Sequence, residues 1–197
     1  MKTKDFLEEC SYFVRADEEW MLSTSPDMAD VWDVMISQKK YEALLRTMQG
    51  IQRRNESPEL FTPVEKITRK VLLGICCRFV RETPLPSGGM FWDLLVKEKS
   101  RRAVETAERV ATGWETEERL LDALENAQGC WWYFIGSEQS KSAAYVACWA
   151  GAGKVLNTSH EIVYSLGSTG QRPAKNVHIR ILADLGNPFE KGDSHGK

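Results

Sequence analysis

Apolar residues recur at helical spacing along most of this 197-residue chain. The segment SRRAVETAERVATG, residues 100–113, is the clearest case, and its apolar face consists of Ala103, Val104, Ala107, Val110 and Ala111. Positions three or four apart lie on one side of an α-helix, so this stripe predicts a helix with one buried face. Gly113 can adopt the left-handed conformation that often ends a helix. Because glutamates stand four positions before two of the arginines, we interpret the basic charge as part of a solvated helix face.

Comparable stripes predict the helices of the N-terminal third. One stripe runs from Phe6 to Val14, a second from Met28 to Ile36 and a third from Tyr41 to Ile51. Their spacing is that of amphipathic helices. Ser25 is expected to cap the second of these helices, with Pro26 in its first position. A turn is expected between the first helix and the second.

The middle of the chain carries the clearest signal for the start of a helix. Thr62, Pro63 and Glu65 fit an N-cap, a first helical position and a capping box, and they predict a helix from there to about Val80. Within it, the stretch VLLGICCRFV is apolar on nearly every side except at Arg78. A helix without a polar face is typical of a protein interior, so we expect the other helices to pack around this one.

The C-terminal half predicts more helices. A short helical piece is expected around residues 91–95, and a longer helix is expected after Thr116, which can serve as its N-cap. Thr158 and Glu161 fit a second capping box. Further apolar residues with helical spacing follow each of these starts.

Residues 167–185 contain two contrasting patterns. The segment GSTGQRPAK, residues 167–175, has no apolar residues that could anchor it, and it is expected to form a mobile loop. The following NVHIRIL alternates like a strand, yet it also fits a helical stripe. We favour a helix, because Gly186 and Pro188 supply the usual signals that end one.

Together these patterns predict an all-α fold, a compact bundle of about seven to nine helices around the central apolar helix. We expect a single helical domain over residues 1–190. Within it, residues 1–55 can form an N-terminal helical subdomain joined by a linker at 55–62. Residues 191–197 are expected to be a disordered tail.

Composition narrows the class of protein. The formal net charge of -2 and the 27 % content of charged residues are ordinary for a globular protein and give no overall attraction to nucleic acid or to anionic membranes. The five cysteines are odd in number and show no CxxC spacing, which favours a reduced, cytoplasmic setting. The longest run of small and apolar residues is about half the length needed to span a bilayer, so no membrane association is expected.

Four blocks of the sequence, taken in order, carry a resemblance: EEWMLSTSPDM, KVLLGICCRFV, KSRRAVETAERVATG and ILADLGNPF. Together they resemble a family of uncharacterised proteins present in many copies in planctomycete bacteria, and SRRAVETAER and GNPF are the most specific parts. The resemblance implies an all-helical fold and no known activity. This chain departs from the family pattern where RETPLPSGGMF follows the cysteine pair, and where QGCWWYFIGSEQSKSAAYV replaces an alanine-rich middle.

No catalytic, cofactor or metal signature is evident. Cys76 and Cys77 are adjacent, and neighbouring side chains on a helix point about 100° apart, so we interpret them as packing residues and not as ligands of one metal ion. The three histidines stand at no ligand spacing. GAGK at residues 151–154 lacks the first glycine and the final hydroxyl residue of a phosphate-binding loop. We therefore predict no metal and no cofactor, and an enzyme with an unrecognised active site stays the alternative function.

Eight basic residues could together form a nucleic-acid surface. Those that could gather on one side of a bundle are Arg53, Arg54, Arg69, Lys70, Lys97, Lys99, Arg101 and Arg102. The interleaved glutamates, the overall acidity and the lack of a helix-turn-helix signature disfavour nucleic-acid binding, which ranks third among the candidate functions.

Seven tryptophans are the most unusual part of the composition. Trp131 and Trp132 are adjacent, so on a helix they cannot both face the core. One of them, with Tyr133 or Phe134, is therefore expected to be exposed or to line a groove. We predict a cytoplasmic, non-enzymatic module that binds another protein or a peptide through Trp131, Trp132, Tyr133 and Phe134.

Overall fold

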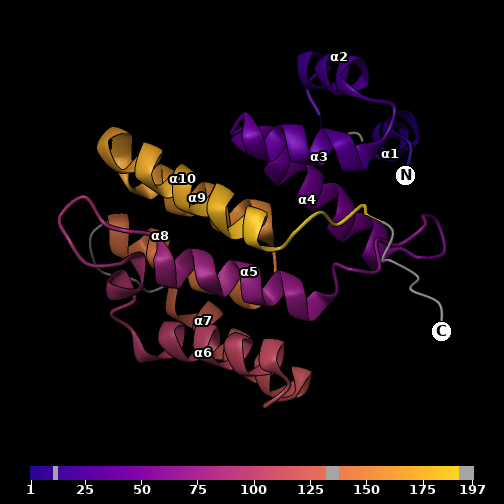
Figure 1. The fold of residues 1–197 in the computed structure, drawn as a ribbon. Coiled ribbons are helices and arrows are strands. Elements are labelled where there is room, and N and C mark those ends of the chain that lie inside the picture. Colours follow the sequence, from indigo (N-terminus) through magenta and orange to yellow (C-terminus); the bar gives the residue numbers. More distant parts are fainter. Residues whose placement is uncertain (11–12, 132–137, 191–197) are drawn as a thin grey trace. The chain divides into compact units, whose positions relative to one another are not determined.

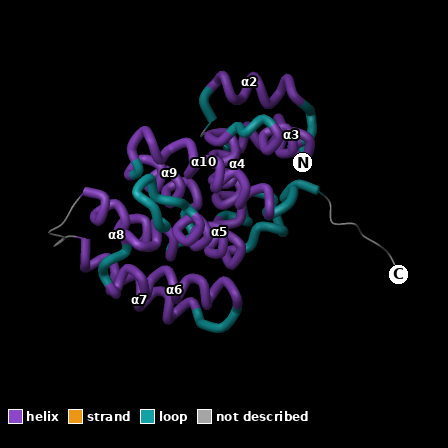
Figure 2. Tube along the Cα trace, turned by 60° about the vertical axis from the view of Figure 1, so that its left-hand side comes forward, coloured by secondary structure: helices purple, strands orange, loops and turns teal. Residues whose placement is uncertain are grey.

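The computed structural model describes residues 1–10, 13–131 and 138–190. Every regular element among these residues is helical: ten α-helices and one short 3-10 helix, with no strand (Figure 2). The predicted all-α class is confirmed, although the number of helices exceeds the expected seven to nine. None of the described helices is both long enough and apolar enough to cross a membrane. Contacts divide the chain into two compact units, Met1–Ile67 with Leu182–Lys197, and Thr68–Ile181.

The first unit contains α1 (Thr3–Glu9), α2 (Arg15–Thr24), α3 (Met28–Ser37) and α4 (Tyr41–Glu56), which are labelled in Figure 1. Pairs in contact are α1 with α2 and α3, α2 with α3, and α3 with α4. The side chains of its core that are at most 1 % exposed include Phe6, Met21, Met28, Val31, Trp32, Met35, Leu44, Leu45, Met48 and Ile51. Most of them belong to the stripes that predicted these helices.

Three predictions about the first helices need correction. The first helix ends at Glu9 and does not continue to Val14, so a separate helix, α2, follows it. Helix α2 lies where only a turn was expected, and it lacks a clear apolar stripe because Met21 is its only buried residue. The cap of α3 is Asp27, whose carboxylate accepts a hydrogen bond of 2.9 Å from the amide of Ala29, so Ser25 and Pro26 lie before the helix.

The predicted helix start at Thr62 is wrong. Helix α5 (Arg69–Glu82) begins after Thr68, whose hydroxyl oxygen accepts a hydrogen bond from the Val71 amide. The preceding backbone is held by Asn55 on α4: its side-chain oxygen accepts from the Val64 amide at 2.8 Å, and its side-chain nitrogen donates to the Val64 carbonyl at 3.1 Å. Because Val64 uses both backbone groups in this way, they are engaged outside any helix.

The second unit contains α5, the 3-10 helix η1 (Phe91–Leu94), α6 (Glu98–Thr112), α7 (Glu117–Trp131), α8 (Glu138–Gly151), α9 (Val155–Ser165) and most of α10 (Gly167–Asp184). Helix α5 contacts α6, α8, α9 and η1, and α8 contacts α6, α7, α9 and η1 as well. That α5 is the helix around which the others pack therefore stays a prediction. Helix α6 matches most of its prediction: Ala103, Val104, Ala107 and Val110 are buried, and Gly113 has φ +83°. Ala111, which was predicted on the same face, is partly exposed.

The start of α10 was predicted wrongly. Residues 167–175, expected to form a loop, are helical, as are the residues that alternate like a strand. Small residues let this polar segment pack closely: Ala174 is fully buried, and a Cβ on Gly170 would lie 2.6 Å from Leu166 and 3.0 Å from Pro86. Large apolar side chains are therefore not needed to anchor it.

The second predicted capping box is also wrong, because α9 already begins at Val155. The Thr158 hydroxyl donates a hydrogen bond of 2.9 Å to the carbonyl of Lys154, one turn earlier in the same helix. A threonine inside a helix often makes this bond, so the same residue type does not by itself indicate a helix start.

Candidate interaction site

The aromatic site predicted from the sequence lies outside the described residues. Trp131 is the last residue of α7 and its side chain is not described, and Trp132, Tyr133 and Phe134 belong to the undescribed stretch 132–137. A docking site at these four residues stays a prediction.

A different candidate lies in the first unit, where the GNPF motif follows α10. The side-chain nitrogen of Asn187 donates two hydrogen bonds to α3, one of 2.8 Å to the carbonyl of Ala29 and one of 2.9 Å to the carboxylate of Asp33. Asn187 is 9 % exposed. A carboxamide has two N–H donors, and both acceptors are in place here. The sequence favoured a helix-ending role for this motif, and the contact with α3 is an additional structural role for Asn187.

Phe189 lies in an aromatic cluster of the same unit. Its ring centre is 5.4 Å from that of Phe6 on α1 and 6.3 Å from that of Trp32 on α3, both in edge-to-face arrangements. Phe189 is 8 % exposed, and both of its partners are at most 1 % exposed. Such pairs stabilise by ~0.5–1.5 kcal/mol beyond the burial of apolar area. Phe189 is therefore a core residue of the first unit, although it follows the last helix of the chain.

The backbone between these two side chains is fixed locally. Gly186 has φ +75°, a conformation that glycine adopts without strain. The side-chain oxygen of Asn187 accepts a hydrogen bond of 3.0 Å from the amide of Phe189, which closes a turn around Pro188. The ammonium group of Lys66 donates to the carbonyl of Asn187 at 3.4 Å. We call residues 187–189 the NPF segment and Phe6, Ala29, Trp32, Asp33 and Lys66 the receptor site.

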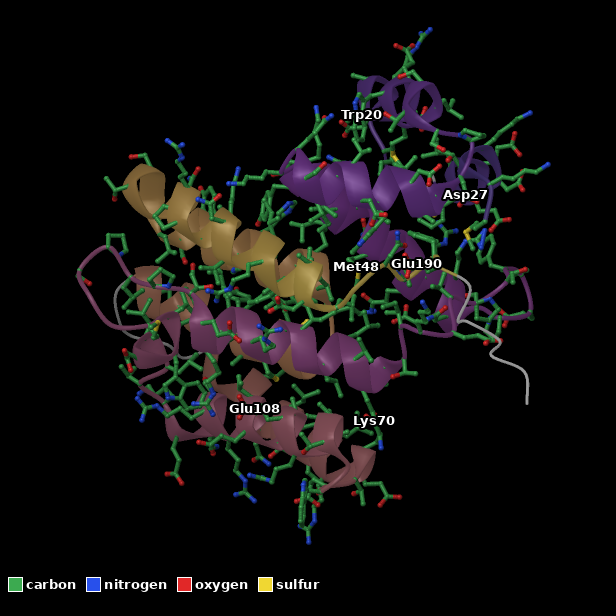
Figure 3. The ribbon with its side chains drawn as sticks, viewed as in Figure 1. Trp20, Asp27, Met48, Lys70, Glu108 and Glu190 are labelled. Carbon is green, nitrogen blue, oxygen red and sulfur yellow. The ribbon has the colours of Figure 1, made fainter. Side chains whose placement is uncertain are left out.

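A cavity of about 570 Å³ adjoins the NPF segment and is lined in part by Pro188 and Phe189. Arg54, which is 3 % exposed, lines the cavity and pairs with the Glu9 carboxylate, and it also donates a hydrogen bond of 3.0 Å to the Thr62 carbonyl. The other charged residues of the lining are Lys2, Asp5, Glu65, Lys66 and Glu190. Glu190, labelled in Figure 3, is the last described residue of the chain. Because cations and acids are mixed here, the cavity favours neither an anion nor a cation by charge alone.

The second unit contains a serine and a histidine in hydrogen-bond contact, which resembles a catalytic arrangement. Ser159 Oγ lies 2.6 Å from Nδ1 of His178, and Thr83 Oγ1 lies 2.9 Å from Nε2. The Thr83 hydroxyl donates to the carbonyl of Phe79, so its oxygen must accept from the Nε2–H group. All three polar residues are fully buried, and the imidazole stacks on the Phe79 ring at 4.1 Å between centres. A substrate has no access to this serine, and the group is a hydrogen-bonded part of the core.

Three of the four described cysteines are core residues. Cys10, Cys76 and Cys77 are buried, and Cys148 is partly exposed. Burial raises the pKa of the Cys10 thiol to about 11 and that of Cys76 to about 12. A thiol with a raised pKa carries little of the reactive thiolate at neutral pH. Among the described residues, no group of three or more histidine, cysteine or acidic side chains could hold a metal ion.

The eight basic residues considered as a nucleic-acid surface are divided between the two units and make different contacts. Arg53 and Arg54 belong to the first unit, and the other six belong to the second. Arg54 is buried beside Glu9, and Arg69 forms an ion pair of 3.0 Å with Glu117. A second cavity, of about 520 Å³, lies along α6 and α7 and includes Arg102, but acidic residues such as Asp122 and Glu125 also line it.

The receptor site escaped prediction because its members are far apart in the sequence. Asn187 and Asp33 are 154 positions apart, and no short motif links them. The available signal was GNPF itself, which offers a carboxamide and an aromatic ring after a helix end. No known family model matches the chain, no curated protein is significantly similar to it, and no solved structure matches its fold. The resemblance to the planctomycete family therefore stays a prediction.

Proposed function

We propose that this protein is a non-enzymatic interaction module and that the receptor site in its first unit recognises a short segment containing Asn-Pro-Phe. The observation that supports the proposal is the set of contacts of the NPF segment. One carboxamide satisfies two acceptors on α3, and one phenyl ring fills an aromatic cluster. Paired polar contacts with an aromatic anchor are the usual means by which proteins recognise short segments.

The specificity of such a site follows from hydrogen-bond chemistry. An aspartate in place of Asn187 has the same shape but no N–H donor, and it would place a second carboxylate within hydrogen-bond distance of Asp33. The loss of both donors removes the hydrogen bonds to the Ala29 carbonyl and to Asp33, each worth about 1 kcal/mol or more. Asn187→Asp is therefore a matched variant that disables the segment and leaves its volume unchanged.

The experiment uses a blocked synthetic peptide with the sequence of residues 184–190, DLGNPFE, and the full chain carrying Asn187→Asp. We expect the peptide to raise the melting temperature of the variant in a concentration-dependent manner, because a ligand that binds only the folded state stabilises it. Wild type should respond at least tenfold more weakly, since its own segment occupies the site. A DLGDPFE peptide is the control and should have no effect.

Two results would contradict the proposal. One is a folded Asn187→Asp chain whose melting temperature does not change at millimolar peptide. The other is an equal response to DLGNPFE and DLGDPFE, which would show that the receptor site does not recognise the asparagine carboxamide. If the variant proves too unstable to handle, Phe189→Leu provides a second chain whose own segment is weakened, with the Asn187 contacts kept.

The sequence-based docking site remains a second proposal. Residues Trp131, Trp132, Tyr133 and Phe134 would contact a protein or peptide, and α8, the next helix, carries Tyr145 and Trp149 with 37 % exposure each. A pull-down that compares wild type with Trp131→Ala and Trp132→Ala tests this site, and unchanged partners would count against it. A cytoplasmic location belongs to the same proposal. An enzyme with an unrecognised active site stays the alternative function.

A further inference from the structure

The receptor site and the NPF segment are far apart in the chain and meet through non-covalent contacts. The receptor residues all lie within the first 67 positions, and the nearest in sequence, Lys66, is 121 positions from Asn187. The intervening residues form the second unit, Thr68–Ile181. Every copy of the chain therefore carries one complete receptor site and one complete ligand for it.

The connection that leads into the NPF segment is lightly packed. Gly186 is exposed, and a Cβ placed on it would have no heavy atom within 4 Å outside its chain neighbours. Leu185 is partly exposed, whereas Asn187, Pro188 and Phe189 are buried. The contacts with the receptor site are therefore made by residues 187–189 and not by Leu185 and Gly186, which connect them to α10.

We infer that the receptor site of one copy can take the NPF segment of a second copy, so that two chains pair by exchanging residues 187–189. This inference rests on the proposed function. The same hydrogen bonds to Ala29 and Asp33 and the same ring contacts with Phe6 and Trp32 would form within one chain or between two chains. Exchange of an identical element between protomers adds no new interface and is a common way to form dimers.

The balance between the two arrangements depends on effective concentration. A segment in the same chain as its receptor is present there at a high effective concentration, so the closed monomer prevails in dilute solution. If one chain cannot use its own segment and another cannot use its own receptor, this advantage disappears. The two defective chains should then form a pair joined by one intact contact.

The experiment mixes two full-length variants. Asp33→Ala removes a receptor acceptor but keeps the segment, and Asn187→Asp disables the segment but keeps the receptor. We expect light scattering after size exclusion to give the 22.4 kDa monomer for each variant alone and a species of twice that mass for the mixture. The wild-type chain should stay monomeric at the concentration at which the mixture pairs. The matched control is the double variant Asp33→Ala/Asn187→Asp, in which each chain offers a defective receptor and a defective segment; mixed with itself it should stay monomeric.

Two outcomes distinguish exchange between copies from the proposed peptide-binding function. If the mixture stays monomeric while the DLGNPFE peptide binds the Asn187→Asp chain, exchange between copies is wrong and the peptide-binding function stands. If the peptide also fails to bind, both are wrong. Should Asp33→Ala or Asn187→Asp unfold, the pair Asp33→Leu and Phe189→Leu repeats the test, because leucine at position 33 has the shape of aspartate without its acceptor oxygens. A monomeric mixture of these folded chains contradicts exchange.

Discussion

The guanidinium carbon of Arg81 on α5 lies 3.3 Å from the ring centre of Trp92 in η1. The same guanidinium donates two hydrogen bonds, of 2.7 and 2.8 Å, to the carboxylate of Glu108 on α6, which is labelled in Figure 3. Arg101 approaches the same indole at 5.5 Å. Arg81 thus connects three elements of the second unit, and the indole is its contact to η1.

Loss of the Trp92 ring should destabilise the protein. Because the side chain is only partly buried, we expect Trp92→Ala to cost about 2–3 kcal/mol, less than for a fully buried tryptophan. Trp92→Phe keeps a ring under the cation and should cost about 1 kcal/mol. The matched control is Trp114→Ala in the same unit, where the ring is 83 % exposed and the change should be within ~0.5 kcal/mol. Urea denaturation measures all three, and equal losses at positions 92 and 114 would show that the Arg81 contact contributes nothing.

His178 should make stability depend on pH. Burial lowers the pKa of this imidazole to about 3, whereas an unfolded histidine titrates near 6.5. Between these values the unfolded chain takes up a proton that the folded chain does not, so stability is complete above pH 6.5 and falls as the pH drops toward 3. At pH 5 the loss is about 2 kcal/mol relative to neutral pH.

The test compares urea denaturation at pH 5 and pH 7.5 for wild type, His178→Gln and Ser159→Ala. His178→Gln removes the titrating group, so its two curves should differ by about 2 kcal/mol less than those of wild type. Ser159→Ala removes the donor to Nδ1 but keeps the buried imidazole, so it should lose stability at both pH values and keep most of the pH dependence. An undiminished pH dependence in His178→Gln would assign the effect to other groups.

Two glycines in helix interiors should respond in opposite directions to alanine. A Cβ on Gly50 would lie 2.6 Å from the sulfur of Cys10 and 2.9 Å from the ring of Phe6, whereas a Cβ on Gly74 would meet only Ala111 at 3.9 Å. We expect Gly50→Ala to destabilise by about 1–3 kcal/mol because the core is overpacked. Gly74→Ala should stabilise by up to about 1 kcal/mol, because alanine favours the helix and no atom is displaced. Thermal unfolding measures both, and a stable Gly50→Ala chain would contradict the packing around Cys10.

The described cysteines should differ in their reaction with iodoacetamide at pH 8. Cys10, Cys76 and Cys77 are buried with raised thiol pKa values, so they should stay unmodified in the folded protein. Cys148 is partly exposed and should be labelled first among these four. Peptide mass spectrometry reads the order, and urea-unfolded protein, in which all should react, is the control. Rapid labelling of Cys76 in the folded state would show that α5 is less buried than the structure has it.

Helices with a regular apolar stripe were predictable because periodicity is a local property. In α6, the buried residues Ala103, Ala107 and Val110 are those that the spacing assigned to the core, and Gly113 ends the helix as expected. Helix α2 lacks such a stripe, since Met21 is its only buried residue, and the pattern could not reveal it. The sequence therefore predicted those helices that bury one regular apolar face.

Helix starts and the candidate site were harder to predict from the sequence. The capping signal at Thr62 is as good as the one at Thr68, and the choice between them reflects the hydrogen bonds of Asn55 to Val64, which only the folded chain brings together. The receptor site also depends on contacts that only the folded chain makes, because Asp33 and Asn187 are 154 positions apart in the sequence. Single-residue preferences of about 1 kcal/mol are easily outweighed by such contacts.

The sequence by itself determined that this protein is helical and which faces of its regular helices are buried, because the spacing of apolar residues fixes both within a few turns. Only the tertiary structure decided that polar residues 167–175 form a helix, that a histidine is held between two hydroxyls, and that Asn-Pro-Phe completes the first unit. These features depend on hydrogen bonds and packing between residues distant along the chain. Such contacts leave no periodic trace in the sequence, since each partner alone is an ordinary polar or aromatic residue.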